Sequence, residues 1–357
     1  MRPRGRFFLR KMTGKLILED KTQIIGESFG AETPMAGEVV FATGMVGYPE
    51  SLTDSSYKGQ ILIFTYPLIG NYGVPDKKLW ESEKIMVAGL IVSTYNATPS
   101  HFQSKQSLAE WFKKENVPLL EIKDTRFLTQ KIREKGTMLG KIIFKKDIQF
   151  HDPNKENLVD QVSTRKTVFI KGSGLKTVLL INCGAKKNIE SCLVKRGVDV
   201  LTVPWDFDPF TEKDFQKFDG ILISNGPGNP KMAVKTIQTI KKAIVRKIPI
   251  LGICLGNQIL ALAAGGDTQK LKYGHRSQNQ PCKMADSDRC FITTQNHGFA
   301  VSKIPDGFKP WFTNANDNTN EGIIHKTLPF MSVQFHPEAT PGPKDTEWIF
   351  DYFLEKI

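Results

Sequence analysis

The sequence predicts an α/β protein, in which a strand-rich α/β N-terminal domain precedes a domain built on a mostly parallel sheet. Residues 14–144 contain short runs rich in Val, Ile and Phe, separated by Gly, Pro and Asn, which are typical of strands. From residue 177 onward, apolar runs alternate with amphipathic helical segments. This alternation indicates a parallel sheet covered by helices on both faces.

The length of 357 residues suits about two domains, and we place the boundaries where the pattern changes. Residues 1–12 are a basic tail or targeting remnant, 13–145 the first domain, 146–176 a polar linker and 177–357 the second domain. The tail is rich in Arg and has no acidic residue. It resembles a mitochondrial targeting segment, but a frayed basic terminus fits equally well, so the mitochondrial matrix and the cytoplasm both stay open.

Composition argues against several classes of protein. The chain has no apolar run near the roughly 20 residues of a membrane span, so we expect a soluble protein without a membrane partner. Its five Cys form no C-x-x-C pair and no metal-ligand spacing, which fits a reducing compartment, and we predict no metal site. The formal charge of +12 is spread along the chain without interleaved stacking aromatics, so we expect a solvated basic surface and no nucleic-acid partner.

The first domain is expected to contain strands at 15–18, 38–42, 60–66 and 85–93. Two amphipathic helices follow. One covers 107–116 and turns its Leu and aromatic residues to one face, and the other covers 124–135. The second helix begins at an Asp or Thr N-cap, ends at a Gly, and is predicted to bury Phe127, Leu128 and Ile132.

The second domain is expected to alternate strands at 178–182, 198–203, 220–224 and 249–253 with helices at 186–196 and 231–247. The latter helix is predicted to bury Val234, Ile237, Ile240 and Ile244 and to expose a basic stripe to solvent. Shorter strands follow at 290–294, 300–302, 322–325 and 331–335, and an amphipathic helix at 345–355 closes the chain. Sites of parallel sheets lie at the carboxyl ends of their strands.

Cys254 is the candidate nucleophile. It lies in GICLG, between the apolar strand that ends at residue 253 and a Leu- and Ala-rich helical run at 258–264. A strand that turns sharply into a helix crowds its own backbone, so glycines such as Gly252 and Gly256 are needed beside the turn. The thiol then points over the helix N-terminus, which favours the thiolate. A small buried core residue is the alternative interpretation of this Cys.

A nucleophilic Cys needs a base, and the base needs an orienting group. His336 stands at the end of the last predicted strand, two residues before Glu338, and residues two apart in a strand point to the same face. This pair is therefore the best candidate for the base and its partner. Of the other histidines, His101 and His151 are expected at the surface and His275 in a polar loop.

Four motifs of the second domain, GICLGNQ, SNGPGNP, QNHGFAV and VQFHPE, together resemble the triad-type (class I) glutamine amidotransferase domain. The first domain narrows the likeness. Its segments GEVVFATGMVGYPESLTD, TYPLIGNYG, DTRFLTQKIREKG and GTMLGKI resemble the glutaminase (small) subunit or domain of carbamoyl-phosphate synthetase. The resemblance covers nearly the whole chain, and GICLG behind this N-terminal domain is a very specific combination.

The resemblance implies a role for each motif residue. Cys254 is the nucleophile, His336 the base and then the acid, and Glu338 its orienting partner. The implied glutamine-binding set is Ser56, Gly226, Gly228, Leu255, Gln258, Asn296, Gly298 and Phe299. The N–H groups of Gly228 and Leu255 are the expected oxyanion hole. From the residues alone, the same positions are also compatible with turns, an Asx turn and, at Gln258, a solvated helix residue.

The chain departs from the family pattern at two places. Asn257 replaces the His that many relatives have after the nucleophile, which is expected to alter substrate affinity or the tuning of the thiol, because Asn does not titrate. Ser55 replaces the usual Pro before Ser56 and is expected to loosen that loop. Some family members have lost the catalytic Cys and use free ammonia, whereas Cys254 is kept here.

The implied activity is hydrolysis of L-glutamine to glutamate and ammonia through a Cys thioester. The family passes the ammonia through a tunnel to a synthetase partner, either a large subunit or a fused domain, which makes carbamoyl phosphate from bicarbonate and ATP. The chain has no G-x-x-x-x-G-K-[ST] loop, so we expect no cofactor here and place ATP and metal on the partner. Whether the carbamoyl phosphate is used to make pyrimidines, arginine or urea stays open. Whether the chain is a free subunit or part of a fused polypeptide also stays open.

Two rival functions remain. A glutaminase for another synthetase, such as one that makes anthranilate or guanylate, lacks the first domain. A non-catalytic glutamine-binding or structural subunit that stabilises the synthetase gains slight support from Asn257. The intact Cys254, His336 and Glu338 favour the working enzyme.

Overall fold

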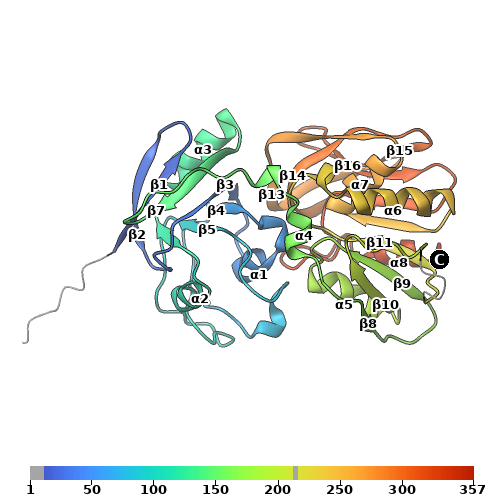
Figure 1. Cartoon of the computed structure of the whole chain (residues 1–357), viewed down its shortest axis with the longest axis horizontal. Helices are drawn as coiled ribbons and strands as arrows, with labels where there is room; N and C mark the ends of the chain where they lie inside the picture. Colours follow the sequence, from blue (N-terminus) through green and yellow to red (C-terminus); the bar gives the residue numbers. More distant parts are fainter. Residues whose placement is uncertain (1–11, 212–215) are drawn as a thin grey trace, which may run out of the picture.

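The computed structural model describes residues 12–211 and 216–357, which form two domains lying side by side (Figure 1). The first domain is drawn in blue to green and the second in green to red. The basic tail predicted at residues 1–12 lies, except for Met12, outside the described residues. Within the described ranges, no helix has both the length and the apolar character that crossing a bilayer requires.

The strands of the first domain close into a barrel in the order β1-β2-β6-β5-β4-β3-β7. Their bounds are Thr13–Leu18 (β1), Gln23–Ser28 (β2), Met35–Ala42 (β3), Gln60–Phe64 (β4), Gly89–Val92 (β5), Leu119–Glu121 (β6) and Met138–Ile143 (β7). β3, β4, β5 and β6 run parallel, and antiparallel pairing of β1 with both β2 and β7 closes the barrel. A strand-rich α/β domain was predicted and is confirmed, although β2, β6 and β7 were not foreseen.

Both sides of the barrel wall are buried. Neighbouring residues on a strand point to opposite faces. Val39 of β3 packs in the apolar cluster that contains the buried face of α3 (Thr125–Lys135), and Val40 packs in a second cluster that contains α2 (Leu108–Lys114). The start of α2 is fixed by a capping box, in which the side chains of Ser107 and Glu110 each bind the other's backbone N–H.

The second domain is built on one sheet, in the order β14-β13-β15-β16-β17-β12-β11-β9-β10-β8. Its middle is parallel and consists of β9 Thr177–Asn182, β10 Asp199–Pro204, β11 Gly220–Ile223, β12 Ile250–Ile253 and β17 Phe330–Val333. An antiparallel extension consists of β13 Asp267–Met284, β14 Cys290–Lys303, β15 Phe308–Asn314 and β16 Asn320–His325, and β8 Val168–Ile170 is an antiparallel edge strand. The predicted α/β class is confirmed, with a larger antiparallel part than expected.

Helices cover both faces of the parallel middle (Figure 1). On one face lie α5 (Lys187–Lys195) and α8 (Trp348–Leu354), which pack with Val178 and Leu180 of β9. On the other face lie α6 (Val234–Val245) and α7 (Leu255–Ala263), which pack with the alternate residues of the same strand, Leu179 and Ile181. The uninterrupted apolar run of β9 is thus explained by burial on both sides.

Two residues predicted to be buried are exposed. Phe127 on α3 is 44% exposed and Val234 at the start of α6 is 52% exposed. In α3 the buried stripe runs through Leu128 and Ile132, and Phe127 falls beside it. In α6 the buried stripe runs instead through Thr236, Thr239, Ile240 and Ala243. The two Thr hydroxyls donate to the carbonyls of Trp205 and Phe207, in the segment that follows β10.

The hairpin of β13 and β14 contradicts three sequence-based expectations. The long strand β13 was not predicted, because its sequence is polar and a third of its residues are exposed. Residues 290–294 and 300–302 belong to the single strand β14, and His275, expected in a loop, is buried in β13. Similarly, the segment expected to be a linker carries α4 (Leu158–Val162) and β8, which adds to the sheet.

The two domains meet beside the N-terminus of α5. The hydroxyl of Ser55, in the first domain, donates to the carbonyl of Gly184. Glu81, also in the first domain, accepts the backbone N–H of Asn188 on its carboxylate at 3.1 Å and that of Lys187 on its carbonyl at 3.1 Å. Because the first N–H groups of a helix lack intrahelical partners, the first domain satisfies the end of a helix in the second.

We expect Gly256→Ala to destabilise the second domain. A Cβ at this position would lie 2.2 Å from the carbonyl oxygen of Ile223, which is strand backbone that does not yield. Overpacking of this kind costs about 1 to 3 kcal/mol, and chemical denaturation of the full chain measures it. Lys241→Ala on the exposed side of α6 is the control, and equal stability of the two variants would contradict the proposed crowding.

Candidate active site

Cys254 occupies the sharp turn between β12 and α7. It has φ 55° and ψ −102°, an unusual conformation for a residue with a side chain, and is 2% exposed. The turn is possible because Gly252 and Gly256 touch: a Cβ on Gly252 would lie 2.5 Å from the Gly256 carbonyl oxygen. Strained backbone of this type is found where a side chain must be presented for function.

His336 follows β17, the parallel neighbour of β12. Ile253 pairs with Val333 across these strands, and the N–H of Cys254 donates to the Val333 carbonyl at 2.8 Å. The two strands therefore deliver Cys254 and His336 to the same edge of the sheet. The Nδ1 of His336 lies 2.6 Å from Glu338 Oε1, while its Nε2 is buried without a hydrogen-bond partner among the described residues.

The charges of this group are coupled. Burial disfavours the imidazolium, but the Glu338 carboxylate and the Cys254 sulfur together raise the pKa of His336 to about 10. Burial also disfavours the carboxylate of Glu338, but Lys186 and His336 hold its pKa down at about 2. These neighbouring charges therefore favour an ionised Glu338 beside a protonated His336. The Cys254 sulfur is the next group beyond His336.

Lys186 is a member of this group that the sequence analysis missed. Its ammonium lies 3.1 Å from Glu338 Oε1, donates to the carbonyl of Ala339, and is almost fully buried. Burial opposes its charge, but the carboxylates of Glu338, Glu81 and Asp54 raise the pKa of Lys186. A Lys in GAKKN directly after an apolar strand was the available signal, because the carboxyl end of a parallel strand is where such sheets place their sites.

The residues of the implied glutamine-binding set line one pocket with Cys254. The pocket lies between the two domains. Its lining includes every residue of that set, namely Ser56, Gly226, Gly228, Leu255, Gln258, Asn296, Gly298 and Phe299. The structure thus brings the whole set together, with Ser56 from the first domain and the others from the second.

The loop after β11 is shaped by close contacts. A Cβ on Gly226 would lie 2.2 Å from the carbonyl oxygen of Cys183, and Gly228 has φ +81°, which favours glycine. Leu158 of α4, in the segment expected to be a linker, packs against Gly228. The glycines are therefore required by the fold of the loop as well as by the approach of any ligand to its N–H groups.

Asp54 of the first domain ties the pocket walls together and was also missed. Its Oδ2 accepts from the Asn296 amide at 2.8 Å and its Oδ1 from the N–H of Ser56 at 2.9 Å. The amide of Asn225 donates to the Ser56 hydroxyl at 3.1 Å. Ser55 is itself bonded to the second domain, so the expectation of a loosened loop at this position finds no support in the contacts.

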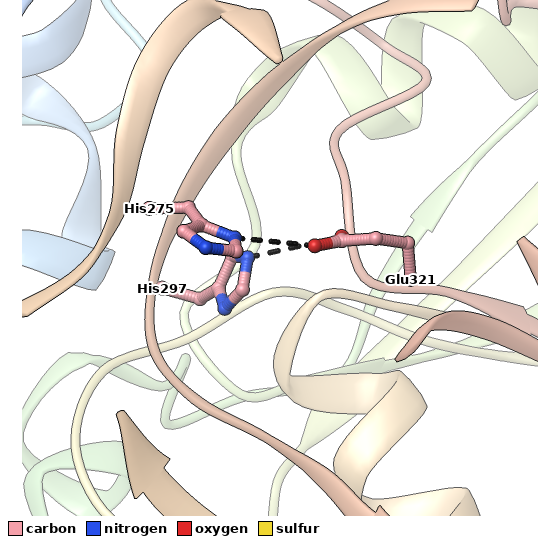
Figure 2. A group of neighbouring side chains, drawn as sticks. All are labelled: His275, His297 and Glu321. Atoms are coloured by element: carbon pink, nitrogen blue, oxygen red, sulfur yellow. Dashed lines mark hydrogen bonds and ion pairs between the residues drawn. The ribbon is translucent and has the colours of Figure 1, made fainter. Parts of the chain in front are cut away.

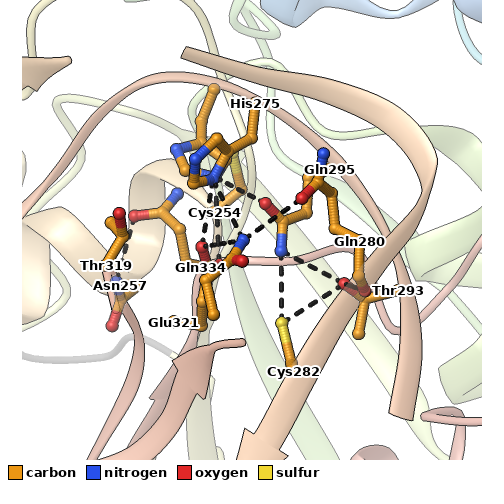
Figure 3. A network of polar contacts seen from close by, with 12 residues as sticks. Cys254, Asn257, His275, Gln280, Cys282, Thr293, Gln295, Thr319, Glu321 and Gln334 are labelled. Carbon is orange, nitrogen blue, oxygen red and sulfur yellow. Dashed lines mark hydrogen bonds and ion pairs between the residues drawn. The ribbon is translucent and has the colours of Figure 1, made fainter. Parts of the chain in front are cut away.

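Gln258 and Asn257 point into the protein. A solvated helix residue was the alternative interpretation of Gln258. The side chain is instead buried, at 2% exposure, and donates to the Phe299 carbonyl at 2.8 Å. Asn257 donates to Gln334 Oε1 at 3.1 Å and accepts from the Ser332 hydroxyl at 2.8 Å. Figure 3 shows Asn257 and Gln334 beside the Cys254 turn. The amide of Asn257 is therefore held by Ser332 and Gln334 and is not part of the pocket lining.

Arg276 was overlooked because its segment, YGHRSQ, was interpreted as a loop. In β13 its guanidinium is buried at the wall of the pocket, where Nη1 donates to the Tyr273 carbonyl at 2.7 Å. Its Nε is buried without a hydrogen-bond partner among the described residues. Burial lowers the pKa of Arg276, but an Arg side chain stays charged in proteins. The pocket therefore contains a positive charge with donor capacity to spare.

The pH dependence of stability tests the His336 pair. The folded-state pKa of about 10 lies above the ordinary value of 6.5, so the charged pair stabilises the fold fully below pH 6.5. This contribution disappears as the pH rises through about 10. We expect the difference in unfolding free energy between wild type and Glu338→Gln to shrink over that range, and a histidine NMR titration to show a lower His336 pKa in the variant. An unchanged pKa would contradict the pairing.

Comparison with known proteins places both halves of the chain. Residues 16–142 match the family "Carbamoyl-phosphate synthase small chain, CPSase domain", and residues 179–356 match "Glutamine amidotransferase class-I". The multifunctional protein ura1 of Schizosaccharomyces pombe is 45% identical over 96% of this chain and 17% of its own length. The multifunctional protein CAD of Squalus acanthias is 48% identical over 95% of this chain and 16% of its own length.

A third relative is the mitochondrial carbamoyl-phosphate synthase [ammonia] of Mus musculus, which is 48% identical over 98% of this chain and 24% of its own length. The chain thus spans between 16% and 24% of the length of these three relatives.

Proposed function

Because the chain belongs to the carbamoyl-phosphate synthase small-chain family and its second half is a class-I glutamine amidotransferase domain, we propose that it hydrolyses L-glutamine to glutamate and ammonia. The observation that carries the proposal is the meeting of Cys254 and His336 at the ends of two adjacent parallel strands. The pocket beside the sulfur is lined by residues of both domains.

The proposed reaction is acyl transfer through the Cys254 sulfur. The thiolate attacks the carboxamide carbon, and the N–H groups of Leu255 and Gly228 receive the negative charge on the oxygen, each worth about 3 kcal/mol in comparable sites. His336 gives its proton to the departing ammonia, which leaves a thioester. It then takes a proton from water, whose oxygen attacks the thioester and releases glutamate and the thiolate. Glu338 holds the imidazole by its Nδ1 throughout.

Arg276 is proposed to bind the α-carboxylate of glutamine. Among the described residues that line the pocket, it is the one Lys or Arg. A guanidinium with an unpaired Nε suits a carboxylate, which it binds through charge-assisted hydrogen bonds. This contact would favour a substrate with a free carboxylate over a simple amide.

The ammonia is proposed to pass to a carbamoyl-phosphate synthetase, as a large subunit or as a fused domain that carries ATP and metal. The relatives support a fused arrangement, because each continues well beyond the matched region. Their names include a mitochondrial protein, and we keep both the mitochondrial matrix and the cytoplasm as proposed compartments. We propose the synthesis of pyrimidines, of arginine and of urea as alternative uses of the carbamoyl phosphate.

A second candidate is a non-catalytic subunit that binds glutamine or stabilises the synthetase. It is favoured by the 48% identity to a relative whose name specifies ammonia. Two observations oppose it. The backbone of Cys254 is strained at the turn before α7, and the imidazole of His336 is bonded to the Glu338 carboxylate. Neither feature is needed for a scaffold.

We expect a glutamine-like electrophile, such as its diazoketone analogue, to label Cys254, with the adduct located by mass spectrometry. His336→Ala should abolish labelling and lower glutaminase turnover by on the order of 10³-fold, because the base is lost. Cys290→Ser, at an exposed thiol, is the matched control and should leave both unchanged. Glutamine binding without any label on Cys254 would instead support the non-catalytic subunit.

We expect Arg276→Met to raise the KM for glutamine by about 10- to 100-fold, since a hydrogen bond to a charged group contributes about 1.5 to 3 kcal/mol. The turnover number should change far less, because the guanidinium does not contact the reacting carboxamide. Arg289→Met, on the exposed turn after β13, is the control. An unchanged KM in steady-state kinetics would exclude Arg276 from substrate binding.

A further inference from the structure

A second polar cluster shares His297 with the lining of the glutamine pocket. His275 on β13, His297 on β14 and Glu321 on β16 are all buried, and one ligand atom from each lies within 4.8 Å of the others. Figure 2 shows the two imidazole rings and the carboxylate converging on one point. The Nδ1 of His275 is 3.2 Å from Glu321 Oε1, and the Nε2 of His297 is 3.9 Å from Glu321 Oε2.

The outward-facing nitrogen of each ring is held by an acceptor. The Nε2 of His275 lies 2.8 Å from the Asp317 carboxylate, and the Nδ1 of His297 lies 2.8 Å from the Phe299 carbonyl. Each of these nitrogens must carry a hydrogen to make its bond. In the neutral tautomers, the inward-facing nitrogens then present lone pairs to the centre of the cluster. Metal-binding histidines show the same arrangement, with the second nitrogen donating to a carboxylate or a carbonyl.

Among the described residues, the Asn314 amide is a donor at the centre of the cluster, 3.5 Å from His275 Nδ1 and 3.4 Å from Glu321 Oε1, but the acceptors there are more numerous. Gln295 donates its amide NH₂ to Cys282 Sγ and Thr293 Oγ1 (Figure 3). This turns its carbonyl oxygen to within 3.2 Å of His297 Nε2. Glu321 Oε2 is buried and has no hydrogen-bond partner among the described residues. The inward lone pair of His297 therefore faces two further oxygen acceptors, and a positive charge is missing there.

A proton on His275, bonded to the carboxylates of Glu321 and Asp317, is the alternative occupant of this site. That alternative leaves Glu321 Oε2 and His297 Nε2 without a donor.

We propose that this cluster binds a divalent transition-metal ion of the zinc type through His275 Nδ1, His297 Nε2 and the Glu321 carboxylate. Two imidazoles and one carboxylate are a ligand set that suits Zn²⁺ and similar ions. A hard cation such as Mg²⁺ prefers oxygen ligands and several waters, which a buried site with two imidazoles does not offer. The assignment departs from the sequence-based expectation of no metal in this chain, which had placed His275 in a loop.

The place of the cluster suggests what the ion would do. Its ligands come from β13, β14 and β16, and on β14 His297 lines the glutamine pocket together with Asn296 and Phe299. An ion would therefore tie three antiparallel strands together at the pocket wall. This role is structural and does not depend on the proposed glutaminase activity.

The test is the metal content of the full, untagged chain, measured by plasma mass spectrometry after one equivalent of Zn²⁺ is added and loose metal is removed. We expect about one bound ion per chain in the wild type and in Cys254→Ser, since the nucleophile is not a ligand. Glu321→Gln and His275→Asn should retain at least tenfold less, whereas His151→Gln, at an exposed His, should match the wild type. No retained zinc in the wild type, or equal retention in Glu321→Gln, would overturn the proposal.

A measurement without variants guards against unfolded mutants. Co²⁺ loaded into the wild type should give the visible bands of a four- or five-coordinate ion with nitrogen and oxygen ligands, without a charge-transfer band from a thiolate. In the metal-free chain, nitrogen NMR should show His297 as the neutral Nδ1–H tautomer. A doubly protonated His297, or an octahedral Co²⁺ spectrum, would show instead that a proton fills the site. Loss of glutaminase activity with normal metal content would concern the proposed function alone.

Discussion

The site depends on one buried chain of alternating charges, in which the Lys186 ammonium, the Glu338 carboxylate and the His336 imidazole follow one another. Each charge would be costly in isolation at this depth, and each is compensated by its neighbour. Removing one member of such a buried pair typically costs about 3 to 5 kcal/mol, because the other charge is left uncompensated. The orientation of the imidazole toward Cys254 is therefore fixed by electrostatics at its far nitrogen. The parallel pairing of β12 and β17 then sets the separation of ring and sulfur.

The first domain is part of this arrangement. The carboxylates of Glu81 and Asp54 both act on Lys186, and the pKa of Glu81 is raised to about 7, chiefly by its burial. Asp54 also bonds to Asn296 in the opposite wall of the pocket. Without the first domain, the pocket would lose Ser56 from its lining, and Lys186 would lose two of the carboxylates that act on it.

The features that sequence could predict are those with a local cause. The crowded turn at Cys254 needs its glycines wherever it occurs, and apolar strands buried on both faces give uninterrupted runs of Val, Ile and Leu. The features that it could not predict depend on distant contacts. β13 is polar along most of its length, and its buried residue His275 is tolerated because Asp317 and Glu321, far away in sequence, supply its partners. Lys186 was missed for the same reason, since its partner Glu338 is more than a hundred residues away.

Strand β14 shows how a polar sequence can be a core element. In QNHGF, neighbouring side chains point to opposite faces of the sheet. Asn296 reaches Asp54 at the glutamine pocket, and His297 turns toward Glu321. The Asn296 amide donates to the Asp54 carboxylate, whereas Glu321 Oε2, beside His297, has no hydrogen-bond partner among the described residues. Evolution usually retains buried polar groups only when they are paired. An unpaired carboxylate oxygen 3.9 Å from His297 Nε2 is therefore a stronger sign of a missing cation than the presence of two histidines alone.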